Sequence, residues 1–361
     1  MTNTVVAADF EYIRKELSNE DRTKFSDSKI VISGAGGFVG YYMVNFLAES
    51  ASSLEIENIL VLDNFTLGHP NWIDALSKKY DFVRIYNFDV SRDRIEKIPG
   101  ISDFDSVIHM ASIASPTYYR KFPLKTIDAN VWGLRNMLNF FSKRRIRGFL
   151  NFSSSEVYGD PDQNQVPIGE EYRGNVAING PRACYDESKR FMETLCYVFN
   201  KEFGTKIVSV RPFNNYGPGM NLNDARAPAD FANSVVNDKD IEVFSDGQST
   251  RTFTYIADAI VGYLKALYYG KFEYFNIGMD TPEISIIGLA ELYAKLGKKI
   301  FGYEGRIIYT KNKDSEYVAD NPRRRCPDIS KAREKLGFSP KIKIDEGVSR
   351  FLTFLKEETG K

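Results

Sequence analysis

A tyrosine and a lysine stand four residues apart in the stretch 180–190, Gly-Pro-Arg-Ala-Cys-Tyr-Asp-Glu-Ser-Lys-Arg. The Gly-Pro pair predicts that a helix begins here, and residues four apart in a helix share one face. Tyr185 and Lys189 can therefore reach the same partner. A free phenol titrates near pH ~10 and a nearby cation favours the phenolate, so the pair indicates a general base that works near neutral pH. Because the same spacing also occurs in ordinary helices, the interpretation depends on two other stretches.

The first of these stretches is 153–159, Ser-Ser-Ser-Glu-Val-Tyr-Gly, which follows a predicted strand at 148–152. A hydroxyl at the end of this strand could hydrogen-bond a substrate hydroxyl or carbonyl. Serines at strand ends are also common in turns, so this stretch indicates a catalytic role only in combination with other residues. Ser154 stands about thirty residues before Tyr185 and Lys189, and the three together form a more specific pattern than any one of them.

The second stretch is rich in glycine and lies near the start of the chain. A β-branched run at 29–33 predicts a strand, the segment 34–40 (Gly-Ala-Gly-Gly-Phe-Val-Gly) has glycine at every third position, and 41–48 has a helical pattern. Small residues let the backbone approach a pyrophosphate, which the N-terminus of the next helix attracts. A second strand at 59–62 ends in Asp63, whose carboxylate would bind the adenosine ribose hydroxyls and repel a 2′-phosphate. The stretch therefore predicts NAD rather than NADP.

Strands and helices alternate along the first half of the chain. We expect further strands at 82–86 and 106–109, and a long amphipathic helix from about 123 to 145. This alternation predicts a Rossmann-type α/β fold, a parallel sheet wound on both faces with the ligand at the carboxyl ends of the strands. Prolines interrupt the pattern from about residue 212. We expect a helical N-terminal extension at 1–28, an NAD-binding Rossmann domain at 29–211, and a smaller substrate-binding lobe that makes up most of 212–361.

Composition excludes several classes of function. The 361 residues contain 48 Lys plus Arg and 48 Asp plus Glu, so no net charge would recruit nucleic acid or an anionic membrane. No apolar run approaches the ~18 residues of a membrane-spanning helix. Three cysteines without metal-ligand spacing indicate reduced thiols in the cytoplasm. With only two histidines and no such spacing, we expect no metal site.

The glycine spacing, Ser154, Tyr185 and Lys189 together resemble the extended short-chain dehydrogenase/reductases, the NAD-dependent epimerase/dehydratase family, over residues 29 to 357. Members of that family mostly remodel nucleotide-linked sugars. The resemblance implies that Tyr185 is the base, that Lys189 lowers its pKa and holds the nicotinamide ribose, and that Ser154 is the partner hydroxyl. The expected cofactor-binding residues are Gly34, Gly37, Phe38, Val39, Gly40, Asp63, Asn64, Asp89, Val90, Ala111, Ser112, Asn130, Tyr185 and Lys189.

Within the family, the chain most resembles the UDP-glucuronate decarboxylases (UDP-xylose synthases). The resemblance is carried by the segments 111–116, 155–160, 180–187 and 321–328. Two residues depart from the pattern. Ser154 replaces the usual threonine, a chemically mild change, and Gly219 replaces the usual arginine, which removes a cation close to the substrate loop and leaves the sugar open. The implied substrate-binding residues are Tyr119, Glu156, Asn214, Arg226, Arg251 and Arg325. We hypothesise that Glu156 positions a substrate carboxylate or assists proton transfer at C5 of the sugar.

The chemistry separates the members of this family. Hydride removal from C4, with Tyr185 taking the hydroxyl proton, creates a 4-ketone. A carboxylate on C5 is then β to the ketone and can leave as CO2, and return of the hydride gives a pentose without consuming NAD. A 4,6-dehydratase instead expels the C6 hydroxyl with an Asp-Glu pair, and here Ser155 takes the place of the aspartate. Decarboxylation of UDP-glucuronate to UDP-xylose is therefore the main prediction, with a 4,6-dehydratase, a 4-epimerase or a 4-dehydrogenase as alternatives.

An NAD-binding protein without turnover is the alternative from a different class. Such relatives typically lose the tyrosine or the lysine, and this chain keeps both. Family members usually pair through the helices that hold Asn130 and Tyr185. The apolar spacing of Phe191, Leu195, Val198 and Phe199 would suit a homodimer, although the same stripe could face the core. The expected partners are a nucleotide sugar and a second copy of the chain.

Overall fold

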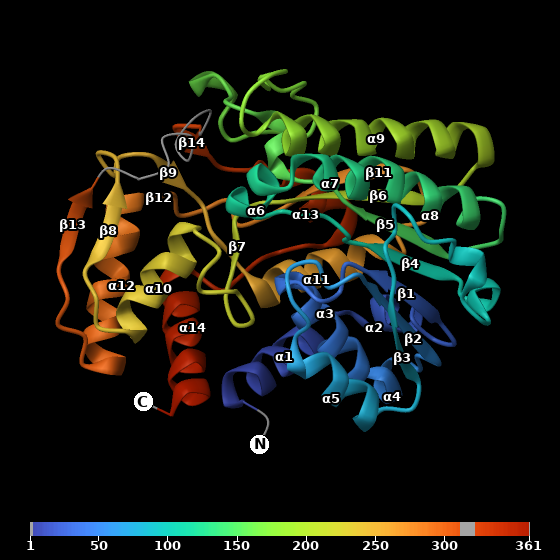
Figure 1. Ribbon diagram of the computed structural model, residues 1–361, viewed down its shortest axis with the longest axis horizontal. Coiled ribbons are helices and arrows are strands. Elements are labelled where there is room, and N and C mark those ends of the chain that lie inside the picture. The colour runs from blue at the N-terminus through green and yellow to red at the C-terminus, as the bar shows by residue number, and fades with distance from the viewer. Residues whose placement is uncertain (1–2, 311–321, 361) are drawn as a thin grey trace.

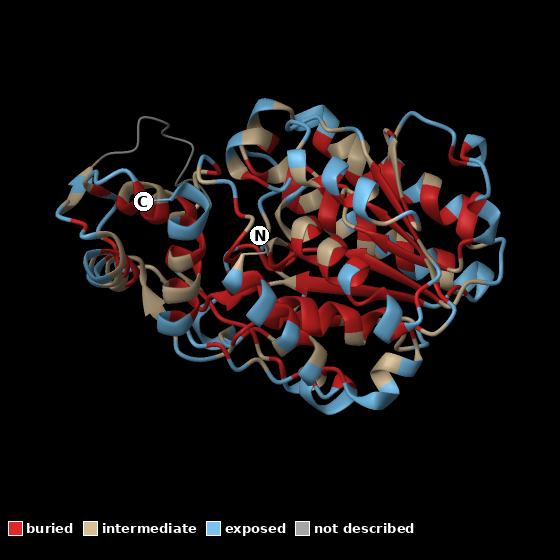
Figure 2. Cartoon of the chain, turned by 90° about the horizontal axis from the view of Figure 1, so that it is seen from below, coloured by how far each residue is buried: buried red, intermediate tan, exposed pale blue. Residues whose placement is uncertain are grey.

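Seven parallel strands form the central sheet, in the order β11–β6–β5–β4–β1–β2–β3. The computed structural model, shown in Figure 1, describes residues 3–310 and 322–360, so Asn321, the first residue of one motif noted above, lies outside the described residues. The strands are β1 (Lys29–Ser33), β2 (Asn58–Asp63), β3 (Val83–Asn87), β4 (Ser106–His109), β5 (Gly148–Phe152), β6 (Ile207–Pro212) and β11 (Glu273–Ile277). The inner strands are buried along almost their whole length, as Figure 2 shows, which is typical of a parallel sheet covered on both faces.

The strand order reverses between β1 and β4, and this reversal makes a crevice at the carboxyl ends of the two strands. The two loops that leave these ends lie very close together. Gly34 has a φ of +74°, and a Cβ at this position would come within 2.4 Å of the Ala111 backbone. The prediction of a Rossmann-type sheet is confirmed, and glycine at position 34 is what allows the two loops to meet.

Helices cover both faces of the sheet (Figure 1). One face carries α6 (Pro116–Lys121), α7 (Pro123–Ile127), α8 (Leu134–Phe141) and α9 (Ala183–Phe203). The other face carries α1 (Thr4–Glu16), α2 (Asn19–Thr23), α3 (Phe38–Glu49), α4 (Ala51–Leu54), α5 (Asn71–Lys79) and α11 (Ile256–Leu267). Short 3-10 turns occur at Ile95–Lys97, Ile101–Asp103, Ser155–Tyr158 and Gln163–Gln165.

The structure differs in two respects from the single long helix expected from about 123 to 145. A π-helical segment, Asp128–Gly133, joins α7 to α8, and the helix ends at Phe141. A Cβ at Gly133 would come within 2.5 Å of Val90, so the wide turn lies directly against the loop after β3. At the end of the helix, the Arg144 guanidinium donates to the carbonyl of Phe140 at 2.5 Å and satisfies one of the terminal acceptors.

The smaller lobe lies beside the carboxyl ends of the strands and is built from short elements. It contains α10 (Ala227–Val236), α12 (Ile286–Phe301), α14 (Ile344–Thr359) and the parallel pair β8 (Ile241–Phe244) and β13 (Ile307–Thr310). Small sheets join it to the main body: β7 (Asn215–Tyr216) with β10 (Thr254–Tyr255), and β9 (Thr250–Arg251) with β12 (Ile284–Ser285) and β14 (Arg324–Arg325). The segment 212–361 also returns to the main body through α11, β11 and α13 (Ser330–Leu336).

The first helix connects the two parts of the molecule. Figure 1 shows α1 between α14 and the helices under the sheet, and α1 packs on both α11 and α14. The buried carboxylate of Asp9 accepts hydrogen bonds from the hydroxyls of Tyr42 at 2.7 Å and Tyr255 at 2.6 Å and pairs with Arg350. No helix within 3–310 or 322–360 is both long enough and apolar enough to cross a membrane.

Candidate active site

A cavity of about 1170 Å³ follows the carboxyl ends of the strands into the smaller lobe. The glycine loop lines one end, Ser154 and Tyr185 line the middle, and α10 and β8 line the other end. Cavities that hold one drug-sized molecule are about 300–1,000 Å³, so this one has room for a dinucleotide and a second ligand. Of the site residues predicted from the sequence, all except Asn130 line it.

At two glycines of the glycine loop, the surrounding backbone leaves no room for a side chain. A Cβ at Gly40 would lie 2.0 Å from the carbonyl oxygen of Ala35, and Gly34 is confined as described above. At Gly37 the nearest atom to such a Cβ is 3.8 Å away, and this residue is the N-cap of α3. The loop therefore presents open backbone at the N-terminus of a helix, which is a site for a pyrophosphate.

Asp63 lies at the end of β2, as the sequence predicts, and its carboxylate is already oriented. One oxygen accepts from the Gly36 N–H at 2.8 Å and the other from the Phe65 N–H at 2.7 Å. Burial raises the pKa of this carboxyl, and the two backbone donors oppose the rise. Each oxygen keeps a further lone pair for a ribose hydroxyl. Next to it, Asp89 accepts from Asn64 at 3.2 Å and from the hydroxyl and the N–H of Ser91.

These residues fit NAD. Besides the open loop and the Asp63 carboxylate, the buried Ser112 hydroxyl lines the cavity without a hydrogen-bond partner among the described residues. A buried polar atom of this kind normally finds a partner, which here a cofactor would supply. The glycine loop would hold the pyrophosphate, Asp63 the adenosine ribose, and Lys189 the nicotinamide ribose.

Asn130 is the predicted cofactor residue that lies elsewhere. It is fully buried in the π-helical segment, and its side-chain amide donates to the Ser188 hydroxyl at 2.8 Å. Ser188 directly precedes Lys189 on α9. Asn130 therefore joins two helices beside Lys189.

The expected catalytic residues converge in the middle of the cavity. Lys189 donates to the carbonyl of Phe152 at 2.7 Å, and its ammonium nitrogen is 5.6 Å from the centre of the Tyr185 ring. Tyr119 stacks on the Tyr185 ring, with centroids 5.1 Å apart and planes 13° apart. Ser154 hydrogen-bonds the Tyr185 phenol and also accepts from the Glu156 N–H at 3.2 Å. Base, cation and partner hydroxyl thus lie within one small region.

The pKa of Tyr185 shifts in the opposite direction from our expectation. Burial raises it to about 12, and the hydrogen bond with Ser154 opposes the rise. Lys189 was expected to lower this pKa, but burial lowers the pKa of Lys189 itself to about 7, which weakens the cation. A further positive charge in the cavity would act in the required direction, and an oxidised nicotinamide carries one.

Glu156 lies between two arginines. Its carboxylate receives both terminal nitrogens of Arg325, at 2.5 and 2.6 Å, and one of Arg182 at 2.5 Å. Burial alone would raise its pKa, but the two guanidinium groups outweigh burial and lower it to about 2. A carboxylate held in this way stays ionised and is a poor proton carrier near neutral pH. The geometry favours the positioning half of our hypothesis over proton transfer.

Arg182 and Asp186 are site residues that the sequence reasoning did not single out. They stand four apart at the start of α9, where Arg182 is the N-cap residue and Asp186 lies in the first turn. Arg182 Nε is 3.5 Å from a carboxylate oxygen of Asp186, and both side chains are almost completely buried. Burial and the nearby charge of Glu156 raise the pKa of Asp186 to about 7. The signal was present in the sequence, because both residues belong to the distinctive 180–187 motif around Tyr185.

The remaining predicted residues lie toward the smaller lobe. Arg251 is buried on β9 and donates to the carbonyls of Thr250 at 2.7 Å and Arg323 at 3.1 Å, and burial lowers its pKa to about 9. Asn214 donates to the Thr252 carbonyl at 2.8 Å, and Arg226 pairs with Asp224. These side chains line the cavity between Tyr185 and the α10–β8 end.

The local structure explains why glycine occupies position 219, where the decarboxylase pattern has an arginine. Its φ is +83°, and a Cβ would come within 2.4 Å of the Tyr41 ring. Tyr41 follows the glycine loop and lines the cavity. An arginine at position 219 would therefore require Tyr41 to move.

A family model for the NAD-dependent epimerase/dehydratase family matches residues 30–278. The chain belongs to this family. Curated relatives include UDP-glucuronic acid decarboxylase 1 of Xenopus tropicalis, which is 34% identical over 95% of this chain and 75% of the relative. UDP-glucuronic acid decarboxylase 5 of Arabidopsis thaliana is 36% identical over 90% of this chain and 88% of the relative.

Solved structures of other family members share the fold of this epimerase/dehydratase. A UDP-glucuronic acid 4-epimerase from Bacillus cereus, in complex with UDP-glucuronic acid and NAD, matches with a TM-score of 0.75 at 24% identity, over 91% of this chain and 99% of the other. A dTDP-glucose 4,6-dehydratase from Streptomyces venezuelae with bound NAD has a TM-score of 0.78 at 19% identity, over 92% and 98%. These likenesses show the fold, and membership of the NAD-dependent epimerase/dehydratase family rests on the family model and the curated relatives.

Proposed function

We propose that this enzyme decarboxylates UDP-glucuronate to UDP-xylose through a transient 4-keto sugar. The observation that carries the proposal is the Glu156 carboxylate held between Arg182 and Arg325. Two guanidinium groups and one carboxylate leave a net positive charge beside Tyr185 below pH 7, where the neighbouring Asp186 is mostly protonated. This charge complements the carboxylate of a uronate sugar. The same pairing leaves Glu156 without the free proton that a dehydratase needs to expel the C6 hydroxyl, and Ser155 supplies no second acid.

The residues suggest the following sequence of steps. Bound NAD supplies a reversible hydride acceptor for C4. Tyr185 takes the proton of the C4 hydroxyl while Ser154 hydrogen-bonds the C4 oxygen. With a ketone at C4, the C5–C6 bond breaks, its electron pair enters an enolate, and CO2 leaves. A proton is then added to C5. As C4 regains its hydride, Tyr185 would return its proton to the C4 oxygen, which gives the pentose.

The other predicted residues support the nucleotide part of this substrate. Asn214 and Arg251 line the cavity beyond Tyr185, where the diphosphate of a nucleotide sugar would lie, and an arginine fork suits phosphate oxygens. Arg226 would border the nucleotide, and Tyr119 would lie beside the sugar. Relatives that carry the name UDP-glucuronic acid decarboxylase over most of their length support the choice of sugar.

The proposal is tested by incubating the purified protein with UDP-glucuronate and NAD and following the nucleotide sugar by mass spectrometry. We expect loss of one CO2 and the appearance of a UDP-pentose. A product of unchanged mass but altered retention would instead make the enzyme a 4-epimerase. Loss of water from another nucleotide sugar, without any change in UDP-glucuronate, would make it a dehydratase.

We further propose that the enzyme works as a cytoplasmic homodimer. Its three cysteines are free thiols, as a reducing compartment favours. Of the stripe noted in the sequence, Phe199 is buried in the core and Leu195 is partly buried. Phe191 and Val198 on α9 are 48% and 40% exposed, and Trp132 on the neighbouring π-helical segment is 49% exposed. These side chains form an apolar face of the kind that a second copy covers.

A Phe191→Glu variant should therefore be monomeric, because it introduces a charge at the centre of this apolar face. Size-exclusion chromatography with light scattering should give the mass of a dimer for the wild type and that of a monomer for the variant. A matched control is Lys78→Glu on α5, an exposed change on the opposite face of the sheet, which should leave the mass unchanged. A wild type that elutes as a monomer would contradict the proposal.

A further inference from the structure

A carboxylate lies one helical turn beyond the catalytic lysine and takes part in no step described above. Tyr185, Lys189 and Glu193 follow one another at four-residue intervals along α9 and so share one face of the helix. Glu193 is half-buried and is held by neighbours on two strands. Its position directly behind the catalytic pair requires an explanation.

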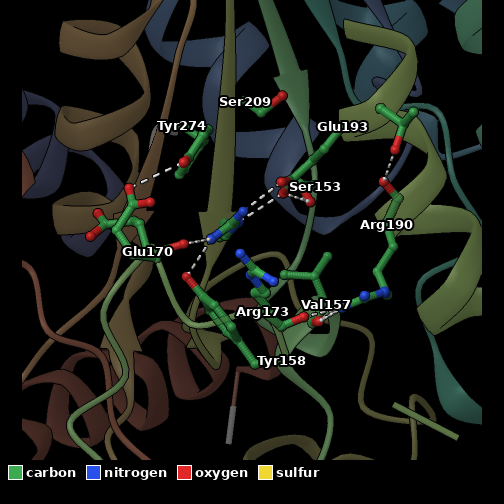
Figure 3. A network of polar contacts seen from close by, with 12 residues as sticks. Ser153, Val157, Tyr158, Glu170, Arg173, Arg190, Glu193, Ser209 and Tyr274 are labelled. Carbon is green, nitrogen blue, oxygen red and sulfur yellow. Dashed lines mark hydrogen bonds and ion pairs between the residues drawn. The ribbon is translucent and has the colours of Figure 1, made fainter. Parts of the chain in front are cut away.

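Glu193 binds the end of β5, next to Ser154. The Ser153 hydroxyl donates to its carboxylate at 2.5 Å, and Figure 3 shows these two side chains pointing toward one another. One residue earlier, the Phe152 carbonyl accepts from Lys189 at 2.7 Å. Two consecutive residues of the strand end are thus fixed to two consecutive turns of α9. This arrangement sets the distance between Ser154 on the strand and Tyr185 on the helix.

Arg211 on β6 holds Glu193 in this orientation. Its guanidinium donates to both carboxylate oxygens, at 2.8 and 2.5 Å, and to the Tyr158 hydroxyl at 2.6 Å. Tyr158 in turn donates to the Asn276 side chain on β11 at 2.7 Å. A bidentate arginine pair has a fixed geometry, so the carboxylate is not free to rotate away from the strand end.

The same network extends to the strand that carries Arg325. The Asn276 amide donates to the carbonyls of Ile168 at 2.8 Å and Asp328 at 3.0 Å. The N–H of Ile168 donates to the Cys326 carbonyl, which directly follows Arg325, at 2.8 Å. Glu193 therefore belongs to a continuous set of hydrogen bonds between the catalytic strand end and the arginine that pairs with Glu156.

Glu193 also acts on Lys189 through its charge. Burial lowers the pKa of Lys189, and the negative charge of Glu193 opposes that shift. The other titratable groups that face Lys189 are Tyr185 on its own helix and His109 on β4, and burial lowers the pKa of His109 to about 3, so this imidazole is neutral. The π-helical segment places the uncharged Asn130 against Ser188, the neighbour of Lys189, and its Asp128 also lines the cavity.

We propose that Glu193 is a positioning residue of the active site, which fixes the end of β5 against α9 and keeps Lys189 in its charged form. Glu193 would act on Tyr185 and Lys189 and not on the substrate, so the proposed role applies to any nucleotide sugar that the wild type converts. The reaction that identifies the substrate and the variants that test Glu193 are therefore separate experiments.

Three variants separate the charge of Glu193 from its hydrogen bond. Glu193→Gln keeps the shape and removes the charge, so the alkaline limb of the kcat/KM–pH profile should move to lower pH by about one to two units. Glu193→Asp keeps the charge and should leave the limb within a few tenths of a unit of its wild-type position. Ser153→Ala removes the hydrogen bond but not the charge, so we expect kcat to fall several-fold with the limb in place.

A second measurement does not depend on substrate. The rate at which an amine-reactive reagent modifies Lys189, followed by mass spectrometry across a pH series, reports the pKa of this lysine directly, and Glu193→Gln should lower it. Glu202→Gln, an exposed position on the same helix, is the matched control and should change neither profile.

The outcomes are distinct. A folded Glu193→Gln variant with an unchanged limb and an unchanged Lys189 pKa overturns the proposal. If removal of one partner leaves Arg211 uncompensated and the variant does not fold, the Glu193→Gln/Arg211→Met double variant is compared with Arg211→Met. The two differ only in the Glu193 charge, so the alkaline limb and the Lys189 pKa should both be lower in the double variant. A wild type inactive on UDP-glucuronate contradicts the proposed substrate only, because the modification profile still tests Glu193.

Discussion

A Tyr185→Phe variant should turn over about 10²–10⁴-fold more slowly than the wild type, the usual loss when a positioned general base is removed. The change deletes one oxygen. The ring that stacks on Tyr119 remains, and the oxygen is hydrogen-bonded to Ser154, a small neutral partner. We therefore expect an unchanged melting temperature and nearly unchanged NAD binding, so that the loss falls on kcat.

The pH dependence of the wild type tests the same assignment. Burial raises the pKa of Tyr185 to about 12, so the phenolate fraction, and with it the rate, should rise with pH until the charge of Lys189 is lost. Tyr197→Phe is the matched control, because Tyr197 lies on the same helix, is 50% exposed and packs its ring on Phe272. A Tyr185→Phe variant with a kcat within about twofold of the wild type would place the base elsewhere.

The parts of the site that follow local rules could be located from the sequence. A strand, a glycine turn and a helix in succession place the phosphate loop, and the end of the next strand places Asp63. Ser154 could be found because it stands at the end of a strand, and Tyr185 and Lys189 because their spacing matches a helix turn. In each case the residues that fix the geometry are neighbours in the chain, so the fold class and the NAD site follow from short stretches.

Contacts between distant parts of the chain could not be predicted in this way. Arg325 meets Glu156 across 169 positions, and no local pattern shows that these two charges neutralise each other. The contact between Asn130 and Ser188 joins two helices 58 positions apart, and no local pattern predicts it. The direction of the Tyr185 pKa shift was also missed, since it depends on burial, which only the tertiary structure reveals.

A Glu156→Gln variant should be destabilised by about 3–5 kcal/mol at neutral pH, the usual effect of removing one partner from a buried ion pair. Arg182 and Arg325 would both lose their carboxylate while remaining buried. The variant should also lose most of its turnover, because the two guanidinium groups would no longer be held beside Tyr185. Chemical denaturation and the rate of CO2 release measure the two effects separately.

The pH dependence of stability has a definite sign for this residue. Arginines lower the pKa of Glu156 from its ordinary value near 4.5 to about 2, so its contribution is fully present above pH 4.5 and disappears as the pH falls toward 2. The stability difference between the wild type and Glu156→Gln should therefore shrink over that range. If Glu156→Gln matched the wild type in both stability and turnover, the paired arginines could not be the basis of sugar selection.

Asp186, the neighbouring carboxyl, provides a control of opposite sign. Burial and the charge of Glu156 raise its pKa to about 7, so the folded state favours the protonated form, and its ionisation opposes folding as the pH rises from about 4 to 7. Asp186→Asn should consequently be more stable than the wild type above pH 7, where Glu156→Gln is less stable. Two carboxylates that contact the same arginine would then respond oppositely to loss of charge, because Glu156 receives hydrogen bonds from two guanidinium groups and Asp186 has one oxygen without a partner among the described residues.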